Sequence, residues 1–261
     1  MRKATGLAAT VHSAGLAELV WPSADGAAPQ ALGAVPLLLG EQPALALPWG
    51  YAAQARAAAA AGTAALVLSE PRLSGPGWLP LAASGPLTLL DDGDGSLFTA
   101  QLLDQELRKH PPARALAGSP LLRREHWWYL PRLVLLLDPQ HVAPVAARSG
   151  PLDAVLAVDD ERLHVRTVRV GAWDDDPLLL DGAPPGVSGP AVLVGQEVSV
   201  PDAERWTVHV TTGRYDAGRL AEVQHPATRA LEPVPGLLAR VRRQRALERG
   251  CVRALRAHGH G

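Results

Sequence analysis

Cysteine, lysine and aromatic residues are all scarce in this sequence. Cys251 is the only cysteine in 261 residues, which excludes a disulfide within the chain and makes a reducing compartment, the cytoplasm, the expected location. Lysine occurs only as Lys3 and Lys109, and the formal net charge is −1 because arginine and the acidic residues nearly balance. Without a basic excess, we expect neither nucleic acid nor an anionic membrane as a partner.

Long apolar runs and the common catalytic motifs are also missing. No run reaches the eighteen apolar residues of a membrane span, and the first fifteen residues lack the apolar core of a signal peptide. A glycine-rich nucleotide loop, a His-Glu-x-x-His pair and a Gly-x-Ser-x-Gly elbow are all absent from the sequence. The sequence therefore assigns no catalytic residue and no metal site.

Glycine and proline are frequent, with 25 and 24 occurrences, which predicts many turns. Together with short apolar runs they indicate a β-rich α+β fold with short helices. At 27.4 kDa the chain forms one large domain or two small ones. The stretch 141–151 is rich in proline, alanine, serine and glycine, so we place a domain boundary there, with domains at 1–145 and 146–261.

The stretch from Leu45 to Leu90 has the clearest local pattern. The alanine-rich segment 51–61 predicts a helix, which Gly62 ends. The apolar run 63–69 predicts a strand, and a proline- and glycine-rich turn separates it from an extended segment at 78–90. The predicted order is strand, short helix, then a hairpin of two strands.

This order resembles the split β-barrel of the pyridoxamine 5′-phosphate oxidase-like family, whose members bind FMN or, in some branches, a deazaflavin or haem. The family's helix bears a Ser-x-Lys-like pair, and Gln54-Ala55-Arg56 stands at that place. The resemblance implies that Arg56 holds a phosphate, with Gln54 and Tyr51 nearby. The alternative is a solvated arginine on a surface helix. The family's basic residue on the preceding strand has no counterpart in this sequence.

Aromatic residues gather before a second buried segment. Trp127, Trp128 and Tyr129 are followed by Arg132 and by the apolar run 133–137, which predicts a strand buried on both faces. The aromatic side chains would wall a bound ring, with Arg132 near an anion. A dimer or subdomain contact explains the same residues equally well, because Trp and Tyr favour both uses.

After residue 151 the pattern changes to further strands, which we expect at 152–158, 162–170, 191–200 and 205–212, with 220–231 irregular. They predict a second half-barrel related to the first. The resembled family forms homodimers, so we expect either a homodimer or a pseudo-dimer within one chain. Arg166 would then meet the helix of Arg56, or would be a solvent-exposed arginine on an edge strand.

The segment 235–257 predicts a long amphipathic helix rich in arginine. Its apolar stripe is expected to pack on the body of the protein along these residues: Leu237, Leu238, Val241, Leu247, Cys251 and Leu255. An RNA or membrane surface is the alternative partner for such a basic helix.

Three functions follow from these patterns. The first is an FMN-type flavin-binding oxidoreductase that transfers hydride to or from a small organic substrate. The second is a non-enzymatic binder of haem or another planar ligand on the same fold, in which His126 or His164 would matter. The third is an assembly protein that has kept the fold and lost its ligand.

Overall fold

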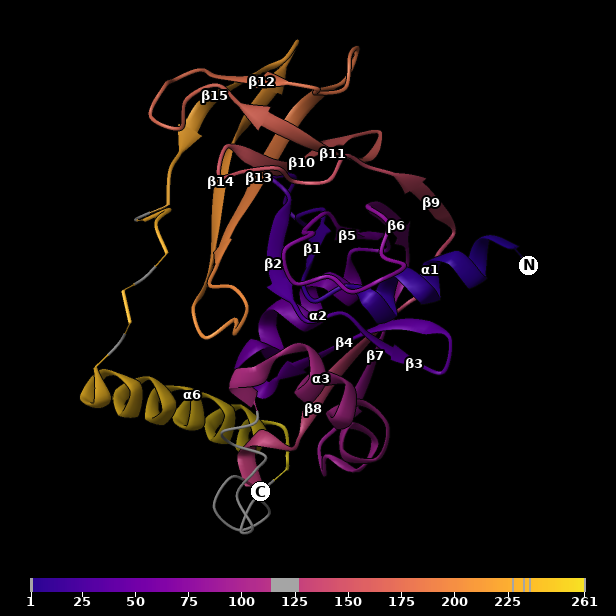
Figure 1. Ribbon diagram of the computed structural model, residues 1–261, viewed down its shortest axis with the longest axis vertical. Helices are drawn as coiled ribbons and strands as arrows, with labels where there is room; N and C mark the ends of the chain where they lie inside the picture. Colours follow the sequence, from indigo (N-terminus) through magenta and orange to yellow (C-terminus); the bar gives the residue numbers. More distant parts are fainter. Residues whose placement is uncertain (1, 114–126, 227, 232, 235, 261) are drawn as a thin grey trace.

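The protein, described here by a computed structural model, has the expected β-rich α+β class and the expected C-terminal helix (Figure 1). The structure describes residues 2–113, 127–226, 228–231, 233–234 and 236–260. Two open sheets form the first half of the chain, a closed barrel forms the second, and a long helix follows the barrel. Within the described ranges, no helix is long and apolar enough to cross a membrane.

The first half consists of two antiparallel sheets, ordered β2-β1-β5-β6-β9 and β3-β4-β8-β7. The five strands of the first sheet are β1 (Ala17–Trp21), β2 (Gln30–Ala34), β5 (Ala64–Leu68), β6 (Leu81–Gly85) and β9 (His141–Pro144). The four strands of the second are β3 (Leu37–Leu39), β4 (Gln42–Pro48), β7 (Leu87–Asp92) and β8 (Arg132–Leu137). Every residue of β8 is buried, as its apolar run predicts.

The central unit has the predicted order. After the short 3₁₀ turn η1 (Trp49–Tyr51), helix α2 (Ala52–Ala60) ends before Gly62, whose φ of 72° is easily adopted only by glycine. Strands β5 and β6 then pair as the expected hairpin. The segment 78–90 is not one strand, because Pro86 separates β6 from β7 and the two belong to different sheets.

A bent two-stranded ribbon joins the two sheets. Strand β7 pairs with β8 in one sheet and β6 pairs with β9 in the other. At the bend, the Asp138 amide donates to the Pro86 carbonyl and the Gln140 amide to the Ser84 carbonyl, each at 3.0 Å. A Cβ on Gly85 would lie 1.9 Å from the Asp138 carbonyl oxygen, so this crossing requires glycine. Strand β9 thus begins inside the stretch 141–151 that we expected to be a domain boundary.

The second half is a closed, antiparallel six-stranded barrel in the order β10-β11-β12-β15-β14-β13. Its strands are β10 (Asp153–Asp160), β11 (Arg162–Val170), β12 (Leu178–Asp181), β13 (Ser188–Val198), β14 (Trp206–Asp216) and β15 (Arg219–Gln224). Strand β15 lies in the segment expected to be irregular. It closes the barrel by pairing with both β12 and β14.

Helices cover the first half. They include α1 (Arg2–Ser13), the π-helical turn η2 (Phe98–Leu102), α3 (Leu103–Lys109) and the 3₁₀ turns η3 (Pro111–Ala113) and η4 (Trp127–Tyr129). Ser96 precedes apolar residues at helical spacing, so the sequence predicts it as the cap of a helix over 96–107. The carboxylate of Asp92 takes this role, because it accepts hydrogen bonds from the amides of Leu97 and Phe98 at 3.0 and 2.7 Å.

The C-terminal helix α6 (Leu237–Ala257) packs on the body through its second part only. Cys251 and Leu255 are fully buried, whereas Leu238 is 74% exposed and Val241 and Leu247 are also exposed. The predicted apolar stripe is therefore not covered along its whole length. In Figure 1 the first turns of α6 extend away from the two sheets, at the end of a long connection from β15.

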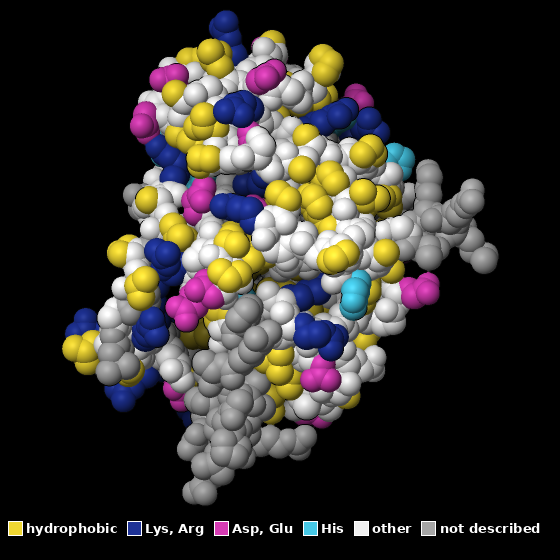
Figure 2. Space-filling view, viewed as in Figure 1, with side chains coloured by type: hydrophobic (Ala, Val, Ile, Leu, Met, Phe, Trp, Pro, Cys, Tyr) yellow, Lys and Arg dark blue, Asp and Glu magenta, His cyan; other side chains and the backbone are white. Residues whose placement is uncertain are grey.

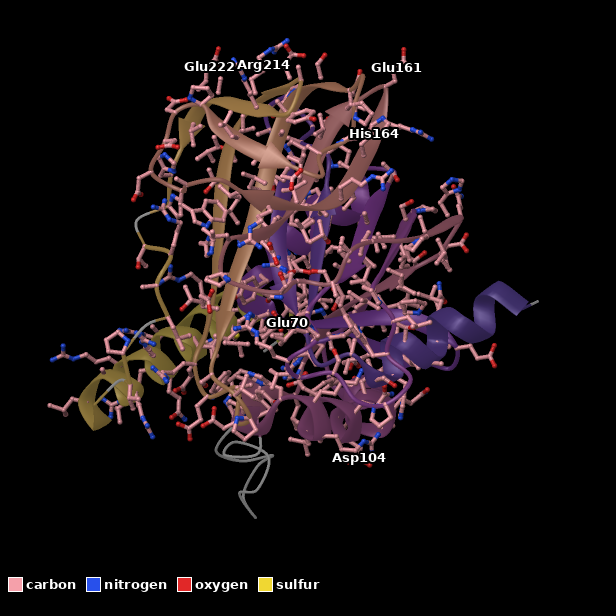
Figure 3. All side chains as sticks on the ribbon, turned by 45° about the horizontal axis from the view of Figure 1, so that its top comes forward. Glu70, Asp104, Glu161, His164, Arg214 and Glu222 are labelled. Atoms are coloured by element: carbon pink, nitrogen blue, oxygen red, sulfur yellow. The ribbon has the colours of Figure 1, made fainter. Side chains whose placement is uncertain are left out.

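Apolar and charged contacts join the two halves. The apolar layer places Val20, Ala65 and Val67 of the first sheet against Val155, Ala157, Val192 and Val194 of the barrel. Beside it, Arg148 donates to Glu18 at 2.6 Å and to the Val194 carbonyl at 2.7 Å. Glu70 lies where the halves meet (Figure 3), and its partner Arg72 also reaches Glu197 of the barrel at 3.4 Å.

Candidate functional site

A cavity of about 710 Å³ lies between the first sheet and the barrel. Residues of β6 and β9 line one side, and β11 with the turn before it lines the other, so we call it the β9–β11 groove. Apolar side chains form much of its lining: Ala65, Ala82, Ala143, Val145, Leu163 and Val165. Figure 2 shows hydrophobic side chains gathered beside the barrel in this region, with basic and histidine side chains along their upper edge.

Strand β11 supplies the positive charge of the groove, and Glu161 in the turn before it adds one carboxylate. Leu163 and Val165 pack against the apolar layer between the halves. Arg162, His164 and Arg166 alternate with them, and all three line the groove. Burial and the neighbouring Arg162 lower the pKa of His164, so its imidazole is neutral at neutral pH. Figure 3 places His164 beside the Glu161 turn, at the outer end of the strand.

The opposite wall adds a second histidine and a hydroxyl. His141 opens β9 and Ser84 lies next to it on β6, where the two residues are register partners. Both line the groove. Two arginines, two histidines and an apolar floor can together hold a flat apolar ring with acidic substituents. Within the described residues, no cluster of three His, Cys, Asp or Glu side chains could hold a bare metal ion.

Arg56 lies elsewhere, on α2, and already has partners. Its guanidinium is 4.0 Å from the Asp91 carboxylate and 5.7 Å from the centre of the Trp49 ring. The imidazole of His260, from the chain's C-terminal end, lies 3.2 Å from the other oxygen of Asp91. A phosphate at Arg56 would have to compete with this carboxylate. Phosphate binding by Arg56 stays a prediction.

The two residues predicted beside Arg56 are both exposed, and so is the first of the predicted ring-wall aromatics. Tyr51 is 43% exposed at the end of η1, and Gln54 is exposed on α2. Trp127 is 40% exposed. None of these side chains lines the β9–β11 groove.

Trp128, Tyr129 and Arg132 are buried in the first half. The Arg132 guanidinium lies 4.1 Å from the ring centres of both Phe98 and Tyr129. The Tyr129 hydroxyl donates to Glu106 at 2.6 Å, and Arg132 pairs with the same carboxylate at 3.5 Å. Tyr129 and Arg132 therefore share one carboxylate in the core, and contact of Trp128, Tyr129 and Arg132 with a ligand stays a prediction.

The structure brings only part of the predicted set together. Trp128, Tyr129 and Arg132 form one cluster, and Tyr51, Gln54 and Arg56 share one segment. Arg166 does not meet the helix of Arg56: it lines the groove, whereas α2 packs on β4, β7 and β8. His126 lies outside the described residues.

Sequence reasoning did not single out His141, Ser84 or Arg162. The alternation of Arg162, His164 and Arg166 along one predicted strand was the signal that could have found one side of the groove. Nothing comparable marks His141, whose strand was not predicted.

Comparisons with known proteins found remote likenesses only. No family model and no curated protein matches the sequence. A solved pyridoxamine 5′-phosphate oxidase-related, FMN-binding protein from Nostoc punctiforme PCC 73102 is 14% identical, covers 80% of this chain and 93% of its own, and has a TM-score of 0.31. A haem-binding protein from Mycobacterium smegmatis is 15% identical, with 96% and 97% covered and a TM-score of 0.36. Likeness at this level carries neither ligand over to this chain.

Proposed function

We propose that this protein binds a planar ring ligand with acidic substituents, of the haem or flavin kind, in the β9–β11 groove. One observation supports this above all: the groove sets an apolar floor beside Arg162, Arg166, His141 and His164. Its volume, about 710 Å³, falls within the usual range for cofactor sites.

Each group has a distinct part in this proposal. Arg162 and Arg166 would pair with the propionates of haem or the phosphate of FMN, because guanidinium groups bind both in charge-assisted pairs. The apolar floor would take the ring and exclude water from one face. His164 is neutral at neutral pH, which is the form that ligates iron. FMN would supply hydride transfer to or from a small organic substrate, whereas haem would supply an iron centre.

Absorption spectroscopy tests the proposal. The purified protein is titrated separately with haemin and with FMN, and a shifted Soret band or a perturbed flavin spectrum reports binding. We expect Arg166→Gln to lower the affinity for the ligand about 3- to 10-fold, because a partly exposed charged contact contributes about 1 kcal/mol. Arg169→Gln is the matched control: it removes the same charge from β11, but Arg169 pairs with Asp153 and does not line the groove.

The outcomes separate the hypotheses. His164→Ala should alter the Soret band of bound haem and leave FMN affinity unchanged. Equal effects of Arg166→Gln and Arg169→Gln would contradict the groove as the site. If only Arg56→Ala lost affinity for FMN, the binding site would lie at α2 and not in the groove. Failure to bind either ligand would refute the proposal and favour the assembly protein.

A further inference from the structure

A second cavity, of about 360 Å³, lies at one end of the C-terminal barrel, and we call it the barrel mouth. Trp173, Glu197, His209 and Arg229 line it together with Leu152. Strand register explains why His209 faces inward. It pairs with Gly195, and Thr211, two residues further on, pairs with Leu193 of the barrel core. Side chains alternate along a strand, so residues 195, 209 and 211 share the inner face.

His209 is held in place by its neighbours. Its side chain is only 4% exposed, and its ring packs edge-on against Trp173 with 5.1 Å between ring centres. The ring fills the space above Gly195, where an added Cβ would lie 1.9 Å from its Cε1 atom. Glycine at position 195 is therefore what allows an imidazole at the floor of the mouth.

Two buried polar atoms on this inner face lack partners. Nδ1 of His209 and Oγ1 of Thr211 have no hydrogen-bond partner among the residues that the structure describes. Buried polar atoms are nearly always hydrogen-bonded, and leaving one unpaired costs about 1–3 kcal/mol. His209 lines the cavity, so its unpaired Nδ1 indicates that a polar group enters there.

The charges around the mouth indicate the kind of ligand. Burial, together with the positive charges of Arg148 and Arg229, lowers the pKa of His209 to about 4, so its imidazole is neutral and offers one donor and one acceptor. Arg229 lies 5.7 Å from the centre of the Trp173 ring, where it pairs with the exposed Asp174 carboxylate and contacts Nδ1 of His225 at 3.4 Å. Because a guanidinium has five N–H donors, these two contacts leave others for a second anion. Glu197 is itself paired with Arg72 at 3.4 Å.

We propose that the barrel mouth binds a small aromatic or heteroaromatic carboxylate. The carboxylate pairs with Arg229, the ring packs against Trp173 and Leu152, and a ring heteroatom hydrogen-bonds to His209. A flat ring matches the combination of an indole, an aliphatic wall and few polar groups. This site is separate from the β9–β11 groove and does not depend on what the groove binds.

Isothermal titration calorimetry with nicotinate and with benzoate tests the site. We titrate each to about 10 mM, since ligands of this size bind at high micromolar to millimolar concentration. We expect both acids to bind, and Arg229→Gln to weaken both about 10-fold or more because a charge-assisted contact is lost. Arg214→Gln is the control: it removes the same charge from an exposed position on β14 (Figure 3). His209→Leu should weaken the binding of nicotinate more than that of benzoate, since only nicotinate has a ring nitrogen.

Near-ultraviolet circular dichroism confirms that each variant is folded. No heat with either acid would overturn the proposal, as would equal affinities of the Arg229→Gln and Arg214→Gln variants. If His209→Leu lowered the affinity for both acids equally, the hydrogen bond assigned to His209 would be wrong.

Discussion

Arg148 and Glu18 form a buried ion pair where the two halves of the chain meet, with 2.6 Å between guanidinium nitrogen and carboxylate oxygen. Arg148 also donates to the Ser69 hydroxyl of the first half and to the Asp153 and Val194 carbonyls of the barrel. Burial raises the pKa of Glu18, and Arg148 opposes that rise. A single side chain thus satisfies acceptors from both halves.

Replacing Arg148 should therefore destabilise the whole protein. We expect Arg148→Ala to lower the free energy of unfolding by about 3–5 kcal/mol, because it leaves the Glu18 carboxylate buried without its partner. Urea denaturation followed by tryptophan fluorescence measures the change. The double variant Arg148→Met/Glu18→Leu should recover much of the loss, since it removes both charges.

Arg169 provides the control for this prediction. It pairs with Asp153 at 3.9 Å, but its side chain is more than half exposed. Arg169→Ala should cost less than about 1 kcal/mol. A similar cost for Arg148→Ala would show that the buried pair does not hold the halves together.

The buried His209 makes stability depend on pH. Its pKa falls from 6.5 to about 4 on folding, so between these values the unfolded state binds a proton that the folded state does not. The contribution of His209 to the free energy of unfolding is therefore complete above pH 6.5. It declines as the pH falls towards 4, by up to about 3 kcal/mol. Urea denaturation at a series of pH values measures this decline.

His209→Gln removes the titrating group and is the comparison for that series. Other ionisable groups contribute to both proteins alike, so the difference between the two curves isolates His209. The variant should lose less stability between pH 6.5 and 4. Parallel curves for the two proteins would rule out a depressed pKa at this histidine.

Two glycines should respond in opposite ways to alanine. At Gly85 an added Cβ meets the Asp138 carbonyl at 1.9 Å, so Gly85→Ala should cost about 1–3 kcal/mol or more. At Gly250, inside α6, nothing lies within 4 Å, and alanine should stabilise the helix by about 0.5–1 kcal/mol. Thermal unfolding measures both, and a tolerated Gly85→Ala would contradict the close crossing at the bend.

Replacing either of two arginines that the sequence predicts near a ligand should change the stability of the protein by different amounts. Arg132 is buried between two rings and beside Glu106, so Arg132→Met should cost about 2–5 kcal/mol. Arg56 is over a third exposed and 4.0 Å from Asp91, so Arg56→Met should cost under about 1 kcal/mol. Chemical denaturation without added ligand compares them. Equal costs would contradict the difference in burial.

Local patterns predicted the elements well, because their causes are local. An alanine run before Gly62 predicts α2, and an apolar run predicts the buried strand β8. The cap at Asp92 was missed because the neighbouring Ser96 suits the same role and only the turn geometry decides between them.

The candidate site was harder to predict because it depends on contacts between distant parts of the chain. The β9–β11 groove exists only once β9 has paired with β6 and the barrel has packed on the first sheet. No local pattern brings His141 next to Arg162 and Arg166. Arg132 shows the converse difficulty: the sequence predicts it near a ligand, but it is buried in the core. A cation beside aromatic residues looks the same in sequence in both cases.

The ribbon that bends at Gly85 and Asp138 has a mechanical consequence. Both of its chain segments pass from one sheet into the other through this bend, so neither sheet can separate from the body while the other stays intact. Hydrogen exchange should accordingly show β6, β7 and β8 opening in a single cooperative step, although they belong to two separate ladders.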